Sequence, residues 1–270
     1  MPSENVEMSP LQGDRRTRKR AARRDALLVL AADLVERDGP DALTMAALAE
    51  AADYAPASLY TYFPSRSALL AALQQEALTV LGRVAEEHLV AWDRALAETG
   101  ADEADAALAR LLAFSRLFLT APEHHAREFH LQQQMLVTRG VAETADVVEV
   151  VPVAMAVLAL PRQLLAAAVE AGALAPHDPV ADPLDHPLEG ALLRTFAWIV
   201  ALNGALMVDG IAAGLPTTGA LLGEEITDSL LRGWGADGAA LARARALASS
   251  LPVALAPSRP GLSGPTLDSP

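Results

Sequence analysis

Apolar residues recur three and four positions apart along most of the chain, which is the period of an amphipathic α-helix. Alternation of β-branched residues is nowhere sustained, so the pattern predicts an all-α fold. The first predicted helix covers about residues 20–38 and stops at Gly39 and Pro40. Further helices are predicted over residues 66–97, 104–120, 123–138, 141–172 with breaks or kinks at Pro152 and Pro161, 188–214, 224–234 and 237–250.

One stretch combines helical spacing with a single tight turn. Thr44 can cap a short helix of about residues 45–51, and a second helix runs through residues 57–62 until Pro64. Asp53 takes the turn position between them, where Asp is tolerated better than most residues other than Gly. Two short helices joined in this way form a helix-turn-helix, the motif whose second helix enters the major groove of DNA.

The residues around this turn resemble the DNA-binding domain of the tetracycline-repressor (TetR) family. The run LYTYFPSR at residues 59–66 is similar to the family's recognition-helix region, and the similarity covers about residues 22–75. The chain departs from the family at Asp53, where Gly is usual, and at residues 55–57, where other members often carry polar side chains. The other matching positions are Gly39, Leu43, Thr44, Leu48, Ala49, Ala68, Leu69 and Leu70.

The resemblance implies an all-α protein with an N-terminal three-helix DNA-binding domain and a C-terminal helical domain for ligand binding and dimerisation. The expected division is a disordered lead at 1–14, the helix-turn-helix domain with a basic arm at 15–64, the effector and dimerisation domain at 65–251, and a disordered tail at 252–270. Helices at about 188–214 and 224–250 would form the homodimer interface. The alternative is that they bury their apolar faces within one chain.

Charge is distributed unevenly along the chain. The net charge is −13, yet residues 15–24 hold seven of the 21 basic residues. A basic end on an acidic body is typical of a protein that meets phosphate at one end. We therefore assign Arg18, Lys19 and Arg20 to DNA contact, along the backbone or in the minor groove. The alternative is a solvated run of charge.

The resemblance also implies a role for individual residues of the motif. Hydroxyl groups can bond several base edges, Ala and Pro can pack on a thymine methyl, and Tyr and Arg suit phosphate oxygens. The alternatives are core packing for the two tyrosines and a solvated position for the arginine. Carried over by position, the residues expected to face bases are Ala55, Pro56, Ala57, Ser58 and Thr61, and those expected to face phosphates are Thr44, Tyr60, Tyr62 and Arg66.

Large side chains of the C-terminal part are candidates for an apolar effector pocket, although ordinary core packing is the preferred interpretation of each one. These are Trp92, Phe114, Phe118, Phe129, Met135, Met155, Trp198 and Met207. His124 and Glu128 are four apart and could share a helix face as metal ligands. Because there is no Cys and no second cluster, a surface turn is the preferred interpretation, and neither a metal nor a cofactor is predicted.

The function predicted is therefore a ligand-responsive transcriptional repressor that binds palindromic operator DNA and a small apolar effector. One alternative is a DNA-binding protein with a filled core and no effector. The other is a helical enzyme, which the sequence does not favour because it has no Cys, Gly-rich phosphate loop or Ser-His-Asp spacing. No secretion signal is seen, and the longest apolar run is shorter than a membrane span, so a cytoplasmic location without membrane contact is expected.

Overall fold

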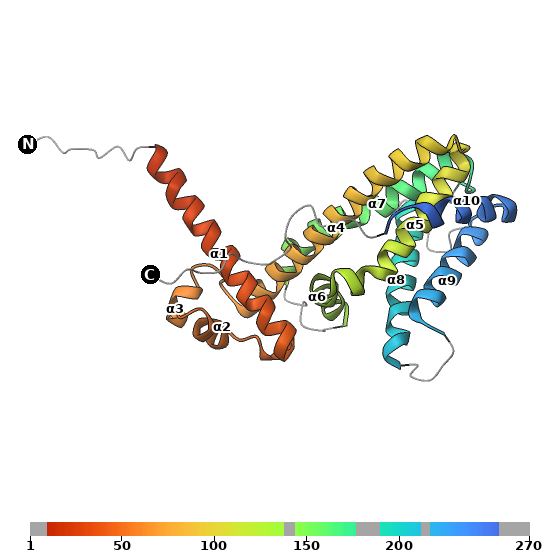
Figure 1. The fold of residues 1–270 in the computed structure, drawn as a ribbon. Coiled ribbons are helices and arrows are strands. Elements are labelled where there is room, and N and C mark those ends of the chain that lie inside the picture. Colours follow the sequence, from red (N-terminus) through yellow and green to blue (C-terminus); the bar gives the residue numbers. More distant parts are fainter. Residues whose placement is uncertain (1–9, 138–143, 177–189, 212–216, 254–270) are drawn as a thin grey trace, which may run out of the picture.

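The computed structural model describes residues 10–137, 144–176, 190–211 and 217–253, and every regular element in these ranges is a helix (Figure 1). The all-α prediction is confirmed. The elements are α1 (Pro10–Asp38), the short 3-10 helix η1 (Pro40–Ala42), α2 (Met45–Ala51), α3 (Pro56–Leu59), α4 (Arg66–Thr99), α5 (Glu103–His124), α6 (Ala126–Val137), α7 (Thr144–Glu170), α8 (Gly190–Ile211), α9 (Gly219–Gly233) and α10 (Gly238–Ser250).

Several helices begin and end where capping chemistry predicts. The Thr44 hydroxyl accepts a hydrogen bond from the Ala47 amide at 3.0 Å, and Ser65 caps α4 in the same way through Ala68. Gly100 follows α4 with φ 65°, a left-handed backbone that Gly adopts at little cost. The next helix then starts from an Asp102 cap. These local bonds define the ends of α2, α4 and α5.

Helix α1 begins ten residues earlier than predicted, at Pro10 rather than about residue 20. The basic stretch at 15–24 is therefore part of a helix and not a separate arm, and the expected disordered lead does not extend to residue 14. The reason lies in composition, because Arg, Lys and Ala are good helix formers and Pro is tolerated in a first turn. Residues 1–9 of the predicted lead lie outside the described residues.

Prolines were weaker helix breakers than predicted. Helix α5 continues through Pro122 to His124, so this proline ends one helix instead of opening the next. Helix α7 runs from Thr144 to Glu170 and contains Pro152 and Pro161, so neither proline breaks it, and a kink at either one stays a prediction. A proline removes one backbone hydrogen bond, a loss that packing against neighbouring helices can offset. Helix α9 starts at Gly219, five residues early, because Thr218 provides its cap.

The N-terminal helices enclose one small core. Leu27, Leu48, Leu59 and Phe63 are almost completely buried within it, as predicted. Leu131 of α6 completes the same core from the other side. The DNA-binding end of the molecule is therefore packed onto the C-terminal domain and does not hang from a free linker. Figure 1 shows α4 running on from this end along the length of the molecule.

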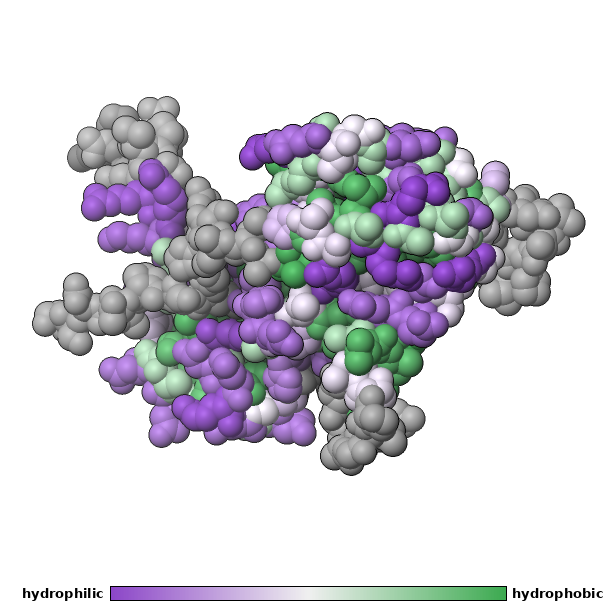
Figure 2. Space-filling model, turned by 45° about the vertical axis from the view of Figure 1, so that its right-hand side comes forward, coloured by the Kyte–Doolittle hydropathy of each residue, from purple (hydrophilic) through white to green (hydrophobic). Residues whose placement is uncertain are grey.

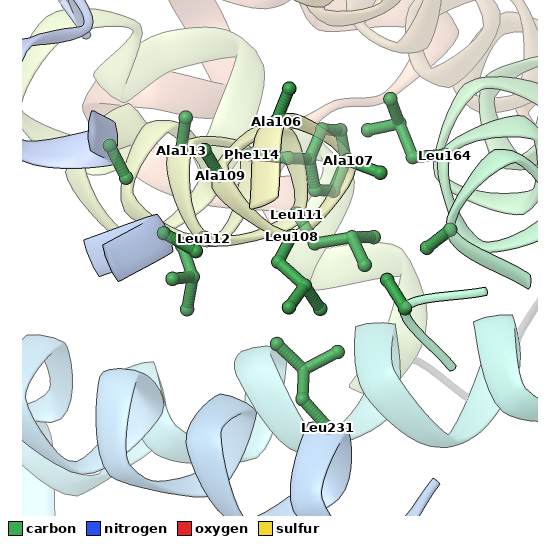
Figure 3. Close-up of a cluster of buried hydrophobic side chains, with 14 of the residues drawn as sticks. Ala106, Ala107, Leu108, Ala109, Leu111, Leu112, Ala113, Phe114, Leu164 and Leu231 are labelled. Atoms are coloured by element: carbon green, nitrogen blue, oxygen red, sulfur yellow. The ribbon is translucent and has the colours of Figure 1, made fainter. Parts of the chain in front are cut away.

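Helix α5 is the centre of the C-terminal core, and α10, α9 and α7 pack on it. Figure 3 shows α5 side chains between α7 and α9, with Leu108 on the side of Leu231. Alternating Ala and Leu along α5 lets neighbouring helices approach closely and fill the space between them. A buried polar contact crosses this core, where the Ser115 and Thr227 hydroxyls lie 2.7 Å apart. The result is a densely packed body behind the DNA-binding end.

Candidate nucleic-acid interface

The turn between α2 and α3 has the geometry that the sequence predicted. Asp53 has φ 54°, and no other non-glycine residue in the described ranges has a positive φ. The Tyr54 amide then donates to the Ala49 carbonyl oxygen at 2.9 Å, which closes the end of α2. This turn fixes the angle at which the chain leaves α2 and enters α3.

Helix α3 is a short helix with one buried side and one exposed side. Leu59 and Phe63 face inward, with exposed fractions of 0% and 1%. The four residues before Leu59 are all exposed, and they are the predicted base-facing residues Ala55, Pro56, Ala57 and Ser58. Because one side is anchored in the core, the other is held in a fixed orientation and is available to a groove.

The helix is shorter than predicted, since it ends at Leu59 and residues 60–62 continue as a turn. Tyr60 is 53% exposed, whereas Tyr62 is half-buried against the N-terminal core. The Thr61 hydroxyl donates to the Ser58 carbonyl oxygen at 2.7 Å, which leaves its oxygen as an acceptor only. The Thr61 hydroxyl can thus accept a hydrogen bond from a base amino group or an amide while its own hydrogen bond to Ser58 stabilises the turn.

The basic part of α1 lies against this turn, a contact that the sequence did not reveal. Arg20 donates to the Thr61 carbonyl oxygen at 2.7 Å, and its guanidinium carbon lies 6.0 Å from the centre of the Tyr62 ring. Arg23 and Arg24 lie over Tyr54 and Phe63 in the same manner, at 5.4 and 5.1 Å. One signal in the sequence could have indicated this contact. The basic residues are spaced three and four positions apart, as on one helix face, and they precede the aromatic residues of the helix-turn-helix.

Two predicted phosphate contacts also have structural partners. Arg66 donates from Nε to the Leu43 carbonyl oxygen and from a terminal nitrogen to that of Pro40, both at 2.6 Å. Thr44 is exposed while it caps α2. Arg18 and Lys19 are exposed along α1. The structure thus brings the motif and the basic stretch together on one end of the molecule, and their contacts with DNA stay predictions.

The candidate effector residues are divided between core and surface. Trp92, Phe114 and Trp198 are buried, and the rings of the last two are tilted by 51° with their centres 5.2 Å apart. Met155 and Met207 are exposed by 39% and 51%. Phe118 lies edge-on against Phe129 with ring centres 5.5 Å apart. The backbone of Met135 lies in α6, and its side chain falls outside the described residues.

Phe129 is the one member of this set that lines the cavity found between α1, α5 and α6. The cavity has a volume of about 330 Å³, which is at the lower end of the range for small-molecule sites. Its lining residues are Val35, Glu36, Pro122, Ala126, Arg127, Phe129, His130, Leu131 and Gln133. Sequence periodicity could not reveal it, because its walls come from helices about ninety residues apart.

The pair His124 and Glu128 does not share one helix. His124 ends α5, the backbone changes direction at His125, and Glu128 lies in the first turn of α6. The four-residue spacing therefore does not place the two side chains on a common face. Within the described ranges there is no group of three or more His, Asp or Glu residues suited to a metal ion.

Helices α8 and α9 present an apolar face that is exposed within the described part of the chain. Phe196, Val200, Met207 and Leu221 are exposed by 38%, 65%, 51% and 60%. Figure 2 shows a cluster of hydrophobic side chains at the lower right of the molecule. Residues Ala191–Val208 are apolar enough to cross a membrane by length and composition, but one such helix is weak evidence, because helices of soluble proteins pass the same test.

Taken together, the motif, its exposed α3 side and the adjoining basic helix define a helix-turn-helix DNA-binding regulator. Residues 27–73 match the family described as bacterial regulatory proteins, tetR family. The helix-turn-helix domain of the chain is therefore of the TetR family of transcriptional regulators. None of the curated proteins matches the chain.

Solved structures share the fold over most of the chain. One is a protein of unknown function from Rhodococcus sp. RHA1, with 21% identity and a TM-score of 0.54, covering 86% of this chain and 99% of that one. RolR in complex with the ligand resorcinol has 22% identity and a TM-score of 0.52, with coverage of 87% and 98%. The fatty acid degradation regulator FadR from Bacillus halodurans has 17% identity and a TM-score of 0.51, with coverage of 79% and 97%.

Proposed function

We propose that this protein is a ligand-responsive transcriptional repressor that binds a palindromic operator as a cytoplasmic homodimer. The observation that carries the proposal is the exposed side of α3, held in place by Leu59 and Phe63 and flanked by the basic part of α1. Such a surface fits the major groove through α3, while the basic side chains of α1 neutralise phosphates.

The residues proposed to meet DNA differ in what they contribute. Ser58 and Thr61 carry the polar groups that can bond base edges, whereas Ala55, Pro56 and Ala57 contribute shape and contact with methyl groups. Tyr60 and Thr44 are exposed and suit phosphate oxygens. Specificity should therefore depend on few hydrogen bonds, and affinity largely on the charged residues of α1.

A homodimer is supported by the uncovered apolar face of α8 and α9. Exposed residues recur on α8 at Phe196, Val200, Gly204 and Met207, which is the spacing of one helix face. A Cβ added at Gly204 would meet no atom of the described residues within 4 Å, so this point of the α8 face leaves room for close approach by a partner. Helix α10 packs against α5, so within the predicted 188–214 and 224–250 interface we assign the contact to α8 and α9 and leave out residues 238–250.

Dimerisation supplies the geometry that an operator needs. Two recognition helices must lie about 34 Å apart to enter successive major grooves on one side of the duplex. A ligand can lower DNA affinity only if it binds another arrangement of the two domains more tightly than the DNA-bound one. Structural relatives include RolR with bound resorcinol, which supports a ligand response here as a proposal.

The experiment is a binding titration of the full-length protein with duplex DNA from around its own gene, at several salt concentrations. A repressor of this kind should bind as a dimer, with affinity that falls steeply as salt rises. Val200→Asp should give monomers and lose tight DNA binding. Ala242→Asp, on an exposed position of α10, is the matched control and should do neither. Salt-insensitive binding, or tight binding by monomers, would contradict the proposal.

A second candidate function is effector-independent DNA binding. The observation in its favour is the packed interior, where Trp92, Phe114 and Trp198 fill space that a ligand would need. A thermal-shift screen separates the two, because a ligand that binds only the folded state raises the melting temperature. An enzymatic role has no such observation in its favour.

A further inference from the structure

We infer that the cavity between α1, α5 and α6 is a regulatory site for a small amphipathic carboxylate that binds Arg127. The inference rests on the proposed function, since it names the class of effector and the place where it acts. The site lies at the junction of the DNA-binding and C-terminal domains, outside the packed core that holds Trp92 and Trp198.

Arg127 forms a polar link between α6 and α1. A terminal nitrogen of its guanidinium donates to the Val29 carbonyl oxygen at 3.1 Å and to the Asp33 carboxylate. The side chain is only 19% exposed, whereas those of Asp33 and Glu36 are 52% and 59% exposed. A partly buried cation on α6 thus pairs with two exposed carboxylates of α1.

The Nε–H group of this guanidinium is buried and has no acceptor. Arg127 Nε is buried and makes no hydrogen bond, because the Glu36 carboxylate is 3.7 Å away, beyond hydrogen-bond distance. A buried N–H without a partner costs free energy that a suitable acceptor would recover. The edge formed by Nε and a terminal nitrogen is the one that binds carboxylates through two parallel bonds.

The rest of the cavity defines the body of the ligand. Its walls include Val35, Pro122, Ala126, Phe129 and Leu131, which are apolar, and Phe129 and Leu131 are nearly buried. A volume of about 330 Å³ accommodates a ring or a short chain and not a large cofactor. A ligand with one carboxylate and an apolar body matches this combination of walls and donor.

Binding would change the link between the domains. The incoming carboxylate would take the Nε edge of Arg127 and displace Glu36, whose exposed side chain can turn into water. It would also compete with Asp33 for the terminal nitrogen. Helix α1 carries the basic residues and contacts the recognition turn through Arg20, so loosening its hold on α6 should lower DNA affinity.

The test uses the full-length dimer with benzoate and octanoate as probes, and benzyl alcohol and octanol as uncharged controls. Calorimetry should show that at least one carboxylate binds, and that its alcohol binds at least about tenfold more weakly. Ala126→Leu fills the cavity and should abolish binding. Ala242→Leu makes the same change at an exposed position of α10 and should bind as the wild type does.

Two further variants test whether Arg127 binds the ligand or only links α6 to α1. Asp33→Asn removes a competitor for Arg127, so it should bind the carboxylate more tightly than the wild type does. Arg127→Lys keeps the charge but lacks Nε, and it should bind at least about tenfold more weakly while its helix content stays unchanged. A purely structural Arg127 would give no tightening in Asp33→Asn.

DNA binding is measured on the same samples. The carboxylate should weaken DNA binding by the wild type and leave that of Ala126→Leu unchanged. If neither carboxylate binds, if the alcohols bind equally well, or if Ala126→Leu binds normally, the site is refuted. If the carboxylate binds but the protein binds no DNA with or without it, the regulator proposal fails and the ligand site stands.

Discussion

Arg20 of α1 donates a hydrogen bond to the carbonyl oxygen of Thr61, 2.7 Å away in the turn that follows the recognition helix. The same guanidinium lies over the Tyr62 ring. A side chain that would otherwise be one more phosphate contact therefore also positions the residues proposed to meet bases. A substitution at Arg20 can separate the effect of its charge on DNA binding from the effect of its contacts with Thr61 and Tyr62.

We predict that Arg20→Lys weakens DNA binding without changing its salt dependence. Lysine keeps the positive charge, but it lacks the planar guanidinium that bonds the carbonyl and stacks on the ring. Lys19→Ala should instead reduce the log–log salt slope by about 0.9, the value for one phosphate contact. Fluorescence anisotropy at several salt concentrations measures both. Equal slopes in the wild type and Lys19→Ala would contradict the assignment of Lys19.

Arg66 provides a prediction about stability. Because it holds the Pro40 and Leu43 carbonyl oxygens, Arg66→Ala should lower the free energy of unfolding by about 1.5–3 kcal/mol, as expected for hydrogen bonds to a charged group. Denaturant unfolding measures this. Arg37→Ala is a matched control on α1, since Arg37 bonds only its exposed neighbour Asp38 within the described chain. A loss of DNA affinity with unchanged stability would favour the phosphate role instead.

Two glycines on neighbouring helices should respond oppositely to the same substitution. At Gly223 of α9, an added Cβ would lie 2.4 Å from Leu119 of α5, so Gly223→Ala should destabilise the fold by about 1–3 kcal/mol. At Gly204 of α8 the space is open, and Gly204→Ala should stabilise the isolated helix by about 1 kcal/mol. Unfolding curves of a monomeric Val200→Asp background measure both. Gly204→Ala in the wild-type background should weaken the dimer, as sedimentation can show.

His125 gives a prediction about pH. Burial lowers the pKa of this imidazole below its ordinary 6.5, against the opposing effect of Glu128, and His124 and His88 lower it further. The unfolded chain binds this proton more readily, so the contribution to stability is complete above about pH 6.5 and is lost as the pH falls below it. His125→Gln should show a smaller loss of unfolding free energy between about pH 7.5 and pH 5 than the wild type shows. Parallel pH profiles would contradict this.

Much of the DNA-binding end could be predicted from local sequence. Thr44, Asp53 and Ser65 act within a few residues of themselves, so their roles as caps and turn follow from residue type and spacing. The buried positions of Leu48, Leu59 and Phe63 follow from the helical period in the same way. The predicted starts of α2 and α4 are confirmed, and in both a capping side chain accepts from a backbone amide three residues further on.

The remaining features depend on contacts between distant segments. The bond of Arg127 to Val29 joins residues 98 positions apart, and the contact of Arg20 with Thr61 joins residues 41 apart. The prediction that Pro122 opens a helix was wrong, because the free-energy cost of a proline inside a helix can be offset by packing, which a periodic pattern does not show. Side-chain size alone does not predict pocket residues, because large apolar side chains also fill a packed core.

The central claim is that the exposed side of α3 contacts DNA, and one pair of variants tests it most directly. Ser58→Glu places a negative charge on that side, and Ser249→Glu places one on an exposed position of α10. Anisotropy titrations with duplex DNA from around the protein's own gene should show loss of binding for Ser58→Glu and wild-type affinity for Ser249→Glu, both at unchanged melting temperature. Wild-type affinity in Ser58→Glu, or no salt-sensitive binding by the wild type, would contradict the account.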